Sequence, residues 1–112
     1  ICYSSTKATQ INIARGLAEL TKGTNVTVNS LLPGPTATER ITDIYQGIAQ
    51  QSNKTEAEAI ADYFKVREPT SLLQRFLTVE EVANVALFLA SDLSSGINGA
   101  AQKVEGGVIR AL

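Results

Sequence analysis

The chain has 112 residues, 44% hydrophobic and 19% charged, which suits one small folded domain or part of one and excludes a disordered or fibrous chain. A formal net charge of −1 argues against nucleic acid or an anionic membrane as the main partner, since both call for a basic surface. No apolar run approaches the roughly 20 residues of a membrane helix. Histidine is absent and Cys2 is the one cysteine, so we expect no Ser-His-Asp triad, intrachain disulfide or metal site.

The chain begins at Ile1, contains no methionine and shows no signal-peptide pattern at its start. No internal repeat or low-complexity tract divides it. We therefore expect residues 1–112 to be the C-terminal portion of a single domain from a longer protein.

The first predicted element is a helix over about residues 3–22, where apolar residues recur at helical spacing. Gly23 follows it as a residue that can adopt positive φ. A short strand over residues 26–32 comes next, rich in β-branched and apolar side chains, and it stops at Pro33 and Gly34.

The pattern loosens from residue 35 to about residue 76, and a long irregular stretch of this kind is typical of a lid or binding loop. One helix is predicted within it, beginning near Thr55, because Thr55 and Glu58 form a capping box. Pro69 prevents its continuation. Two interpretations of the aromatic residues here stay open, lining a substrate pocket or packing the lid. They are Tyr45, Tyr63, Phe64 and Phe76.

The clearest predicted helix follows Thr78, which makes a second capping box with Glu81. An apolar stripe at helical spacing continues it through Val82, Val85, Ala86 and Leu89. A turn-rich segment over residues 91–99 leads to a last strand over about 101–105. Strands alternating with helices favour an α/β fold with a parallel sheet, and two parallel strands alone bury too little surface. We expect the other strands in a missing N-terminal part.

Tyr3 and Lys7 are four residues apart on the first helix, which places both side chains on one face. A phenol with a pKa near 10 exchanges protons poorly at neutral pH, and a nearby ammonium lowers that pKa by favouring the phenolate. The pair can therefore transfer protons without histidine. The alternative, a surface pair with no chemical task, stays open on spacing alone.

Further motifs follow the Tyr-x-x-x-Lys pattern of residues 3–8 in order. They are the strand 25–34 with its Val-Asn-x-x-x-Pro-Gly ending, Thr38, Arg75-Phe76 with 79–83, and the segments 88–92, 97–99 and 104–107. In this order they resemble the C-terminal half of the short-chain dehydrogenase/reductase family, mostly its three-oxoacyl-carrier-protein-reductase-like members. The resemblance omits only about residues 41–70, the expected substrate lid. Glu105 stands where the family more often has aspartate.

The resemblance implies that Tyr3 is the general acid for carbonyl reduction, or the base for alcohol oxidation. It implies that Lys7 lowers the pKa of Tyr3 and hydrogen-bonds the ribose of NAD or NADP. Pro33 and Gly34 would shape the turn beside the nicotinamide. Without the other motifs, the same pair is also typical of an ordinary turn at the end of a strand. The resemblance implies two further contacts with the cofactor. The backbone of Thr36 would contact the nicotinamide carboxamide, and Thr38 would lie near the carboxamide or the pyrophosphate.

The implied fold is the C-terminal part of a Rossmann-type doubly wound parallel sheet, its last two strands with covering helices and a lid over about 37–76. The missing N-terminal dinucleotide-binding half would hold the glycine-rich phosphate loop and the catalytic serine and asparagine. A small carbonyl or alcohol substrate, a cytoplasmic location and a homo-oligomer are also implied, with the first helix and the 78–91 helix as interface surfaces. We expect the chain alone to be inactive.

Two alternatives to an oxidoreductase stay open. The chain could be a non-catalytic remnant or interaction module that folds only by association, since the phosphate loop lies outside it. It could also derive from a family member that has lost its activity and only binds.

Overall fold

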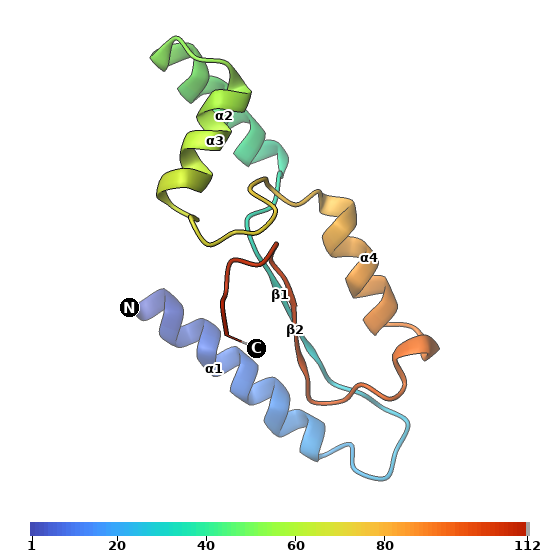
Figure 1. The fold of residues 1–112 in the computed structure, drawn as a ribbon. Helices are drawn as coiled ribbons and strands as arrows, with labels where there is room; N and C mark the ends of the chain where they lie inside the picture. Colours follow the sequence, from blue (N-terminus) through green and yellow to red (C-terminus); the bar gives the residue numbers. More distant parts are fainter. Residues whose placement is uncertain (112) are drawn as a thin grey trace. The chain divides into compact units, whose positions relative to one another are not determined.

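The computed structural model describes residues 1–111, in which three α-helices and a short 3₁₀ helix separate two strands and a further helix precedes them (Figure 1). In chain order they are α1 (Cys2–Glu19), β1 (Ser30–Pro33), α2 (Glu39–Ser52), α3 (Glu56–Val66), α4 (Val79–Leu89), the short 3₁₀ helix η1 (Asp92–Ser94) and β2 (Ala101–Val104). The chain forms two compact units. The first unit contains Ile1–Leu32 and Ala83–Lys103, and the second contains Pro33–Val82 and the residues from Val104 onward.

Helix α1 ends at Glu19, three residues before the predicted end at Lys22. The N–H groups of Leu20 and Thr21 each bond the carbonyl three residues back, at 3.0 and 3.1 Å, which tightens the last turn and stops the helix. Gly23 has a φ of 78° in the turn that follows, so its predicted positive φ is confirmed.

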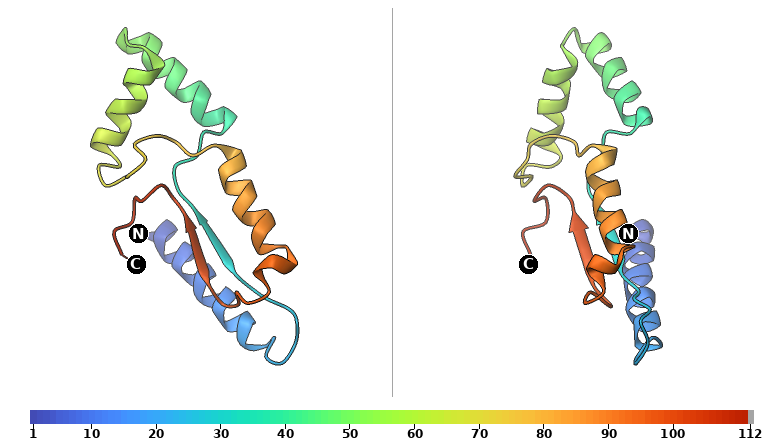
Figure 2. Two further views of the ribbon diagram at one scale, coloured as in Figure 1. Left: turned by 45° about the vertical axis from the view of Figure 1, so that its right-hand side comes forward. Right: turned by 90° about the vertical axis from the view of Figure 1, so that its right-hand side faces the viewer.

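Strands β1 and β2 form a two-stranded sheet and run side by side in Figure 2. The Ser30 N–H donates to the Ala100 carbonyl at 2.8 Å, and the Gly34 N–H donates to the Val104 carbonyl at 2.9 Å. Donors and acceptors advance together along the chain, so the strands are parallel, as predicted. The predicted start of the first strand at residue 26 is wrong, because the Val28 N–H bonds the Asn98 side chain at 2.9 Å.

Helix α2 was not predicted from the sequence, which indicated one helix between residues 35 and 76. Its N-cap, Thr38, makes no side-chain capping hydrogen bond, and Ile41 stands at the N3 position, so no capping box marks the start of this helix. The helix ends at Ser52, and its C-cap residue Asn53 adopts the left-handed conformation with a φ of 52°. It packs against α3, and its Ala49 is buried.

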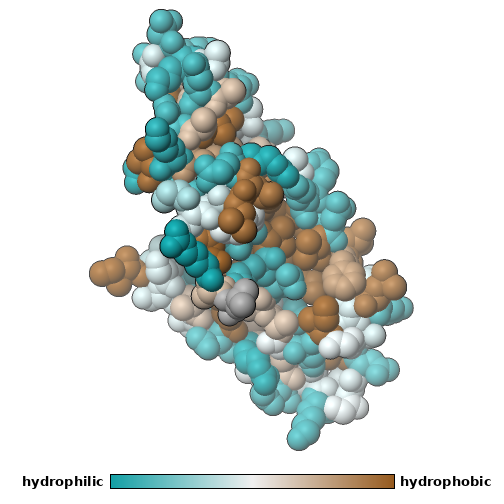
Figure 3. Space-filling view, in the orientation of Figure 1, coloured by the Kyte–Doolittle hydropathy of each residue, from teal (hydrophilic) through white to brown (hydrophobic). Residues whose placement is uncertain are grey.

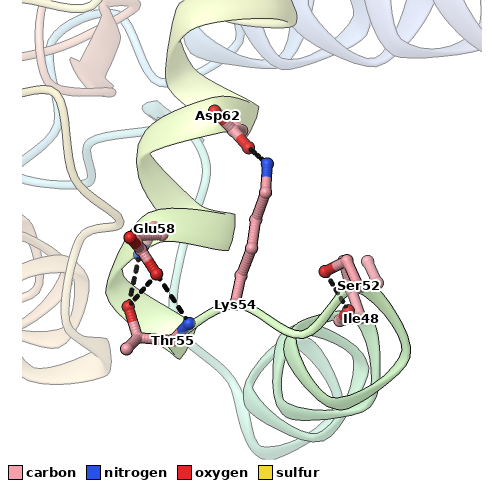
Figure 4. A network of polar contacts seen from close by, with 6 residues as sticks. All are labelled: Ile48, Ser52, Lys54, Thr55, Glu58 and Asp62. Carbon is pink, nitrogen blue, oxygen red and sulfur yellow. Dashed lines mark hydrogen bonds and ion pairs between the residues drawn. The ribbon is translucent and has the colours of Figure 1, made fainter.

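Helix α3 begins at the predicted capping box. The Thr55 hydroxyl accepts from the Glu58 N–H at 3.2 Å, and the Glu58 carboxylate accepts from the Thr55 N–H at 2.8 Å (Figure 4). This backbone hydrogen bond lowers the pKa of Glu58. Lys54, in the connection between α2 and α3, forms an ion pair with Asp62, which lies one turn after Glu58 in α3. This ion pair links the connection to α3.

The four aromatic side chains of the second unit pack against one another, so the packing interpretation is confirmed. Their rings contact in pairs with centroid separations from 5.0 Å, between Tyr63 and Phe64, to 5.6 Å, between Tyr45 and Tyr63. Phe76 lies 5.1 Å from Phe64, whose side chain is only 1% exposed. This cluster is the centre of the second unit's core.

The predicted capping box of α4 is also confirmed. The Glu81 N–H donates to the Thr78 hydroxyl at 3.1 Å, and the Glu81 carboxylate accepts from the Thr78 N–H at 2.8 Å. The Arg75 guanidinium donates two hydrogen bonds to the same carboxylate, at 2.8 and 2.9 Å. The Arg75 hydrogen bond, followed by that of the Thr78 backbone, lowers the pKa of Glu81 from 4.5 to about 2.

We expect Glu81→Gln to reduce the dependence of stability on acid pH. Since the folded state depresses the Glu81 pKa from 4.5, the ionised carboxylate stabilises the fold above about pH 4.5, and this contribution disappears as pH falls toward 2. The free energy of unfolding of the variant should be lower than that of wild type at neutral pH. It should also decrease less between pH 4.5 and pH 2. Denaturant unfolding of the intact protein at several pH values measures this. Glu80→Gln is the control, and equal pH slopes for wild type and Glu81→Gln would contradict the prediction.

Large apolar side chains remain exposed in both units. Leu17 of α1 is 48% exposed, Leu87 of α4 is 71% exposed, and Leu72 of the second unit is 84% exposed. Figure 3 shows hydrophobic residues interspersed with hydrophilic ones on the face it draws. Exposed apolar surface of this kind is typical of faces covered by other polypeptide. Within residues 1–111, no helix combines the length and the apolar character needed to cross a bilayer.

Candidate functional site

Tyr3 and Lys7 lie one turn apart near the start of α1, in the first unit. The Lys7 Nζ atom is 5.6 Å from the centroid of the Tyr3 ring, so the predicted common face is confirmed. The same ammonium donates to the Gln10 side-chain oxygen at 3.3 Å. The Tyr3 side chain is 74% exposed, which leaves its hydroxyl accessible to a bound molecule.

The other two tyrosines sit in a different environment. Burial raises the pKa of the Tyr45 phenol, an effect partly offset by Arg67. Burial also raises the pKa of Tyr63, with a further contribution from Glu68, whose carboxylate accepts from the Tyr63 hydroxyl at 3.5 Å. Both phenols therefore stay protonated at neutral pH.

The turn after α1 is held within the first unit by Asn98. Its side-chain amide donates to the Thr21 hydroxyl at 2.9 Å, while its amide oxygen accepts from the Val28 N–H. Next to it, Gly99 has a φ of 71°, and a Cβ there would lie 3.1 Å from the Arg15 side chain of α1. These contacts fix the end of the helix that carries Tyr3. Sequence reasoning missed this role of Asn98, for which the Asn-Gly pair before a strand is the available signal.

Gly34 directly follows β1 and belongs to the second unit. A Cβ on Gly34 would lie 2.7 Å from both Cα and Cβ of Glu105, the residue after β2. The glycine is therefore required by a close approach of two backbones at this corner.

We expect Gly34→Ala to destabilise the protein by about 1–3 kcal/mol, because the added methyl group must displace the Glu105 backbone. Gly47→Ala is the matched control in the same unit, since nothing lies within 4 Å of a Cβ there and a helical alanine is favoured. Denaturant unfolding of the intact protein measures both. Equal effects of the two substitutions would show that the corner tolerates a side chain.

Thr36 forms an isolated parallel bridge with Leu77. The bridge uses the Pro35 carbonyl, which accepts from the Leu77 N–H at 2.9 Å, and the Ala37 N–H, which donates to the Leu77 carbonyl at 2.8 Å. The Thr36 N–H therefore lies outside the bridge. Its hydroxyl donates to the Gly34 carbonyl at 2.9 Å.

Thr38 follows as the N-cap residue of α2, and its N–H donates to the Thr36 carbonyl at 2.9 Å. The structure thus links Pro33, Gly34, Thr36 and Thr38 in one segment of the second unit, while Tyr3 and Lys7 are paired in the first.

The first unit also has an open groove of about 290 Å³. One side of the groove is lined by alternate residues of β1 and of the segment just before it. The other side is lined by the C-terminal part of α4 and the residue that follows it. The lining residues are Thr27, Asn29, Leu31, Ala86, Leu89 and Ala90. None of the predicted site residues lines this groove.

Comparison with known proteins assigns the family. A family model described as enoyl-(acyl carrier protein) reductase matches residues 2–109. The chain belongs to the short-chain dehydrogenase/reductase family. The resemblance derived from the motifs is thereby confirmed.

Among curated relatives of this short-chain dehydrogenase/reductase chain, the uncharacterized oxidoreductase YvrD of Bacillus subtilis (strain 168) is 60% identical over the whole chain. The 3-oxoacyl-[acyl-carrier-protein] reductase FabG of Aquifex aeolicus is 37% identical over 95% of it. The chain spans 43% and 37% of the lengths of these two proteins.

A similar solved structure is L-sorbose reductase from Gluconobacter frateurii, complexed with NADPH and L-sorbose. It superposes with a TM-score of 0.83 at 25% identity, covering 98% of this chain and 41% of the reductase. The two parallel strands and their helices correspond to the C-terminal portion of that family's Rossmann-type fold, as the sequence predicted.

Proposed function

We propose that the intact protein is an NAD(P)-dependent oxidoreductase that moves hydride between nicotinamide and a small carbonyl or alcohol substrate. Family membership supports the oxidoreductase class. The observation that carries the assignment of residues is the exposed Tyr3 phenol with the Lys7 ammonium 5.6 Å from its ring.

In this proposal, Tyr3 donates its phenolic proton to the substrate oxygen during carbonyl reduction and accepts a proton from the hydroxyl during alcohol oxidation. The Lys7 ammonium favours the phenolate form electrostatically and donates to ribose hydroxyls of the cofactor. The bound nicotinamide supplies or accepts the hydride.

The donor groups of the chain fit this cofactor chemically. An ammonium and a phenol on one helix face suit a ribose diol, and a backbone N–H outside the local bridge suits a carboxamide oxygen. We assign the carboxamide contact to the Thr36 backbone and place Thr38 near the carboxamide or pyrophosphate. Pro33 and Gly34 shape the backbone beside the nicotinamide.

The remaining parts of the proposal concern the intact protein. Its N-terminal half supplies the glycine-rich phosphate loop together with a catalytic serine and asparagine, and residues 37–76 serve as a substrate lid. The exposed apolar residues of α1 and α4 support contact with that half and with a second subunit of a homo-oligomer. We place the protein in the cytoplasm and expect residues 1–112 alone to be inactive.

The test is turnover by the intact protein with NADH and NADPH against a panel of ketones and aldehydes, followed by absorbance. Oxidation of at least one cofactor in the presence of a carbonyl compound is expected. Absence of turnover with both cofactors across the panel, combined with normal folding, would favour a non-catalytic protein.

A further inference from the structure

We propose that the turn formed by residues 105–109 is a positioning element for the substrate lid. It connects residues 70–74, which we call the lid base, to the Gly34 corner, and it thereby sets the affinity for the carbonyl substrate. The inference rests on the proposed function, in which residues 37–76 are the substrate lid. All of these residues belong to the second unit.

The first contact is between the turn and the lid base. The Gly106 carbonyl accepts two backbone hydrogen bonds, from the Leu72 N–H at 2.8 Å and the Leu73 N–H at 3.1 Å. The Thr70 hydroxyl donates to the Val108 carbonyl at 2.6 Å. The Ser71 hydroxyl also donates to the Gly106 carbonyl, at 3.5 Å. These hydrogen bonds join two segments that are more than 30 residues apart in the chain.

The turn has a backbone shape that these contacts require. Gly106 and Gly107 both have positive φ, at 68° and 78°. A Cβ on Gly107 would lie 2.5 Å from the Leu72 side chain, so the glycine lets the lid base approach closely. The Glu105 carboxylate accepts from the Ile109 N–H at 2.9 Å and closes the turn.

The second contact is between the turn and the proposed cofactor segment. Glu105 begins the turn, and its backbone is the one that excludes a Cβ on Gly34. The Val104 carbonyl just before it accepts from the Gly34 N–H. The turn therefore touches the Gly34 corner at one end and the lid base at the other.

The lid base is itself held by internal hydrogen bonds. The buried Ser71 hydroxyl accepts from the Gln74 N–H at 3.1 Å, and the Gln74 side chain donates to the Ser71 carbonyl at 2.7 Å. Gln74 holds a φ of 50°, which is uncommon for a residue other than glycine. A base held in this way transmits its position to the lid, so loosening it should weaken substrate binding and leave the proton-transfer residues unaltered.

Thr70→Val in the intact protein is the test, because valine keeps the branched shape and removes the hydroxyl. We expect KM for the carbonyl substrate to rise about two- to tenfold, as for loss of one hydrogen bond, with kcat and cofactor affinity unchanged. Thr70→Ser should restore the wild-type KM. Thr24→Val is the matched control, since it removes a hydroxyl that donates to the Thr21 carbonyl at 2.7 Å, in the turn after α1 and outside the lid.

Hydrogen exchange supplies a readout that does not depend on activity. The Leu72 and Leu73 amides should exchange several-fold faster in Thr70→Val and at the wild-type rate in Thr24→Val. If Thr70→Val folds poorly, Glu105→Ala is the second variant, because it removes the hydrogen bond between the Glu105 carboxylate and the Ile109 N–H. Its KM and its amide exchange at Leu72 and Leu73 are measured in the same way. Unchanged KM and exchange, or a joint loss of kcat, cofactor affinity and thermal stability, would overturn the inference. Retained activity in Tyr3→Phe would overturn only the proposed function.

Discussion

Replacing Tyr3 by phenylalanine is expected to lower the kcat of the intact protein by about 10²- to 10⁴-fold, the usual contribution of a general acid or base. The substitution removes one hydroxyl and keeps the ring, whose 74% exposure makes a folding defect an implausible cause of lost activity. Cofactor affinity should change much less than kcat, because Lys7 and the Thr36 segment keep their contacts. Steady-state kinetics with saturating cofactor measure the effect.

Tyr45→Phe is the matched control, because it removes the same hydroxyl from a tyrosine packed among aromatic rings. Its kcat should equal that of wild type. If Tyr3→Phe also turned over at the wild-type rate, the proton would have to come from another group, and the assignment of Tyr3 would be wrong.

Replacing Lys7 by methionine is expected to impair both chemistry and binding. The phenol loses the ammonium 5.6 Å from its ring, and the ribose loses a charged donor. A hydrogen bond to a charged group contributes about 1.5–3 kcal/mol, so cofactor affinity should fall roughly ten- to a hundredfold, together with a decrease in kcat. Calorimetric titration of NADH and NADPH into the intact protein measures the affinity.

Lys22→Met is the control for the loss of one positive charge, since Lys22 is an exposed residue of the turn after α1. Its cofactor affinity should stay at the wild-type level. A Lys7→Met protein that binds cofactor as tightly as this control would argue against the ribose contact, even if its turnover were reduced.

Local signals in the sequence predicted local structure well. The capping boxes at Thr55 and Thr78 mark the starts of α3 and α4, because both partners of each box lie within four residues. The spacing of Tyr3 and Lys7 placed them on one face of a helix for the same reason. Helix α2 was missed because Ile41 stands at the N3 position after Thr38, where a capping box has Glu or Gln.

Features set by distant residues could not be predicted. The start of β1 depends on Asn98, 70 residues away, whose side chain takes the Val28 N–H out of the strand ladder. The need for glycine at position 34 depends on the approach of Glu105. Similarly, the sequence left the role of the aromatic residues undecided, since only tertiary structure brings Tyr45 and Phe76 together.

The most direct test of the central claim is a crystal structure of the intact protein with NADPH or NADH. We predict that the Tyr3 hydroxyl and the Lys7 ammonium both lie within hydrogen-bonding distance of the nicotinamide ribose, with the Thr36 N–H on the carboxamide. A cofactor bound away from α1, or a ribose that contacts neither Tyr3 nor Lys7, would contradict the account.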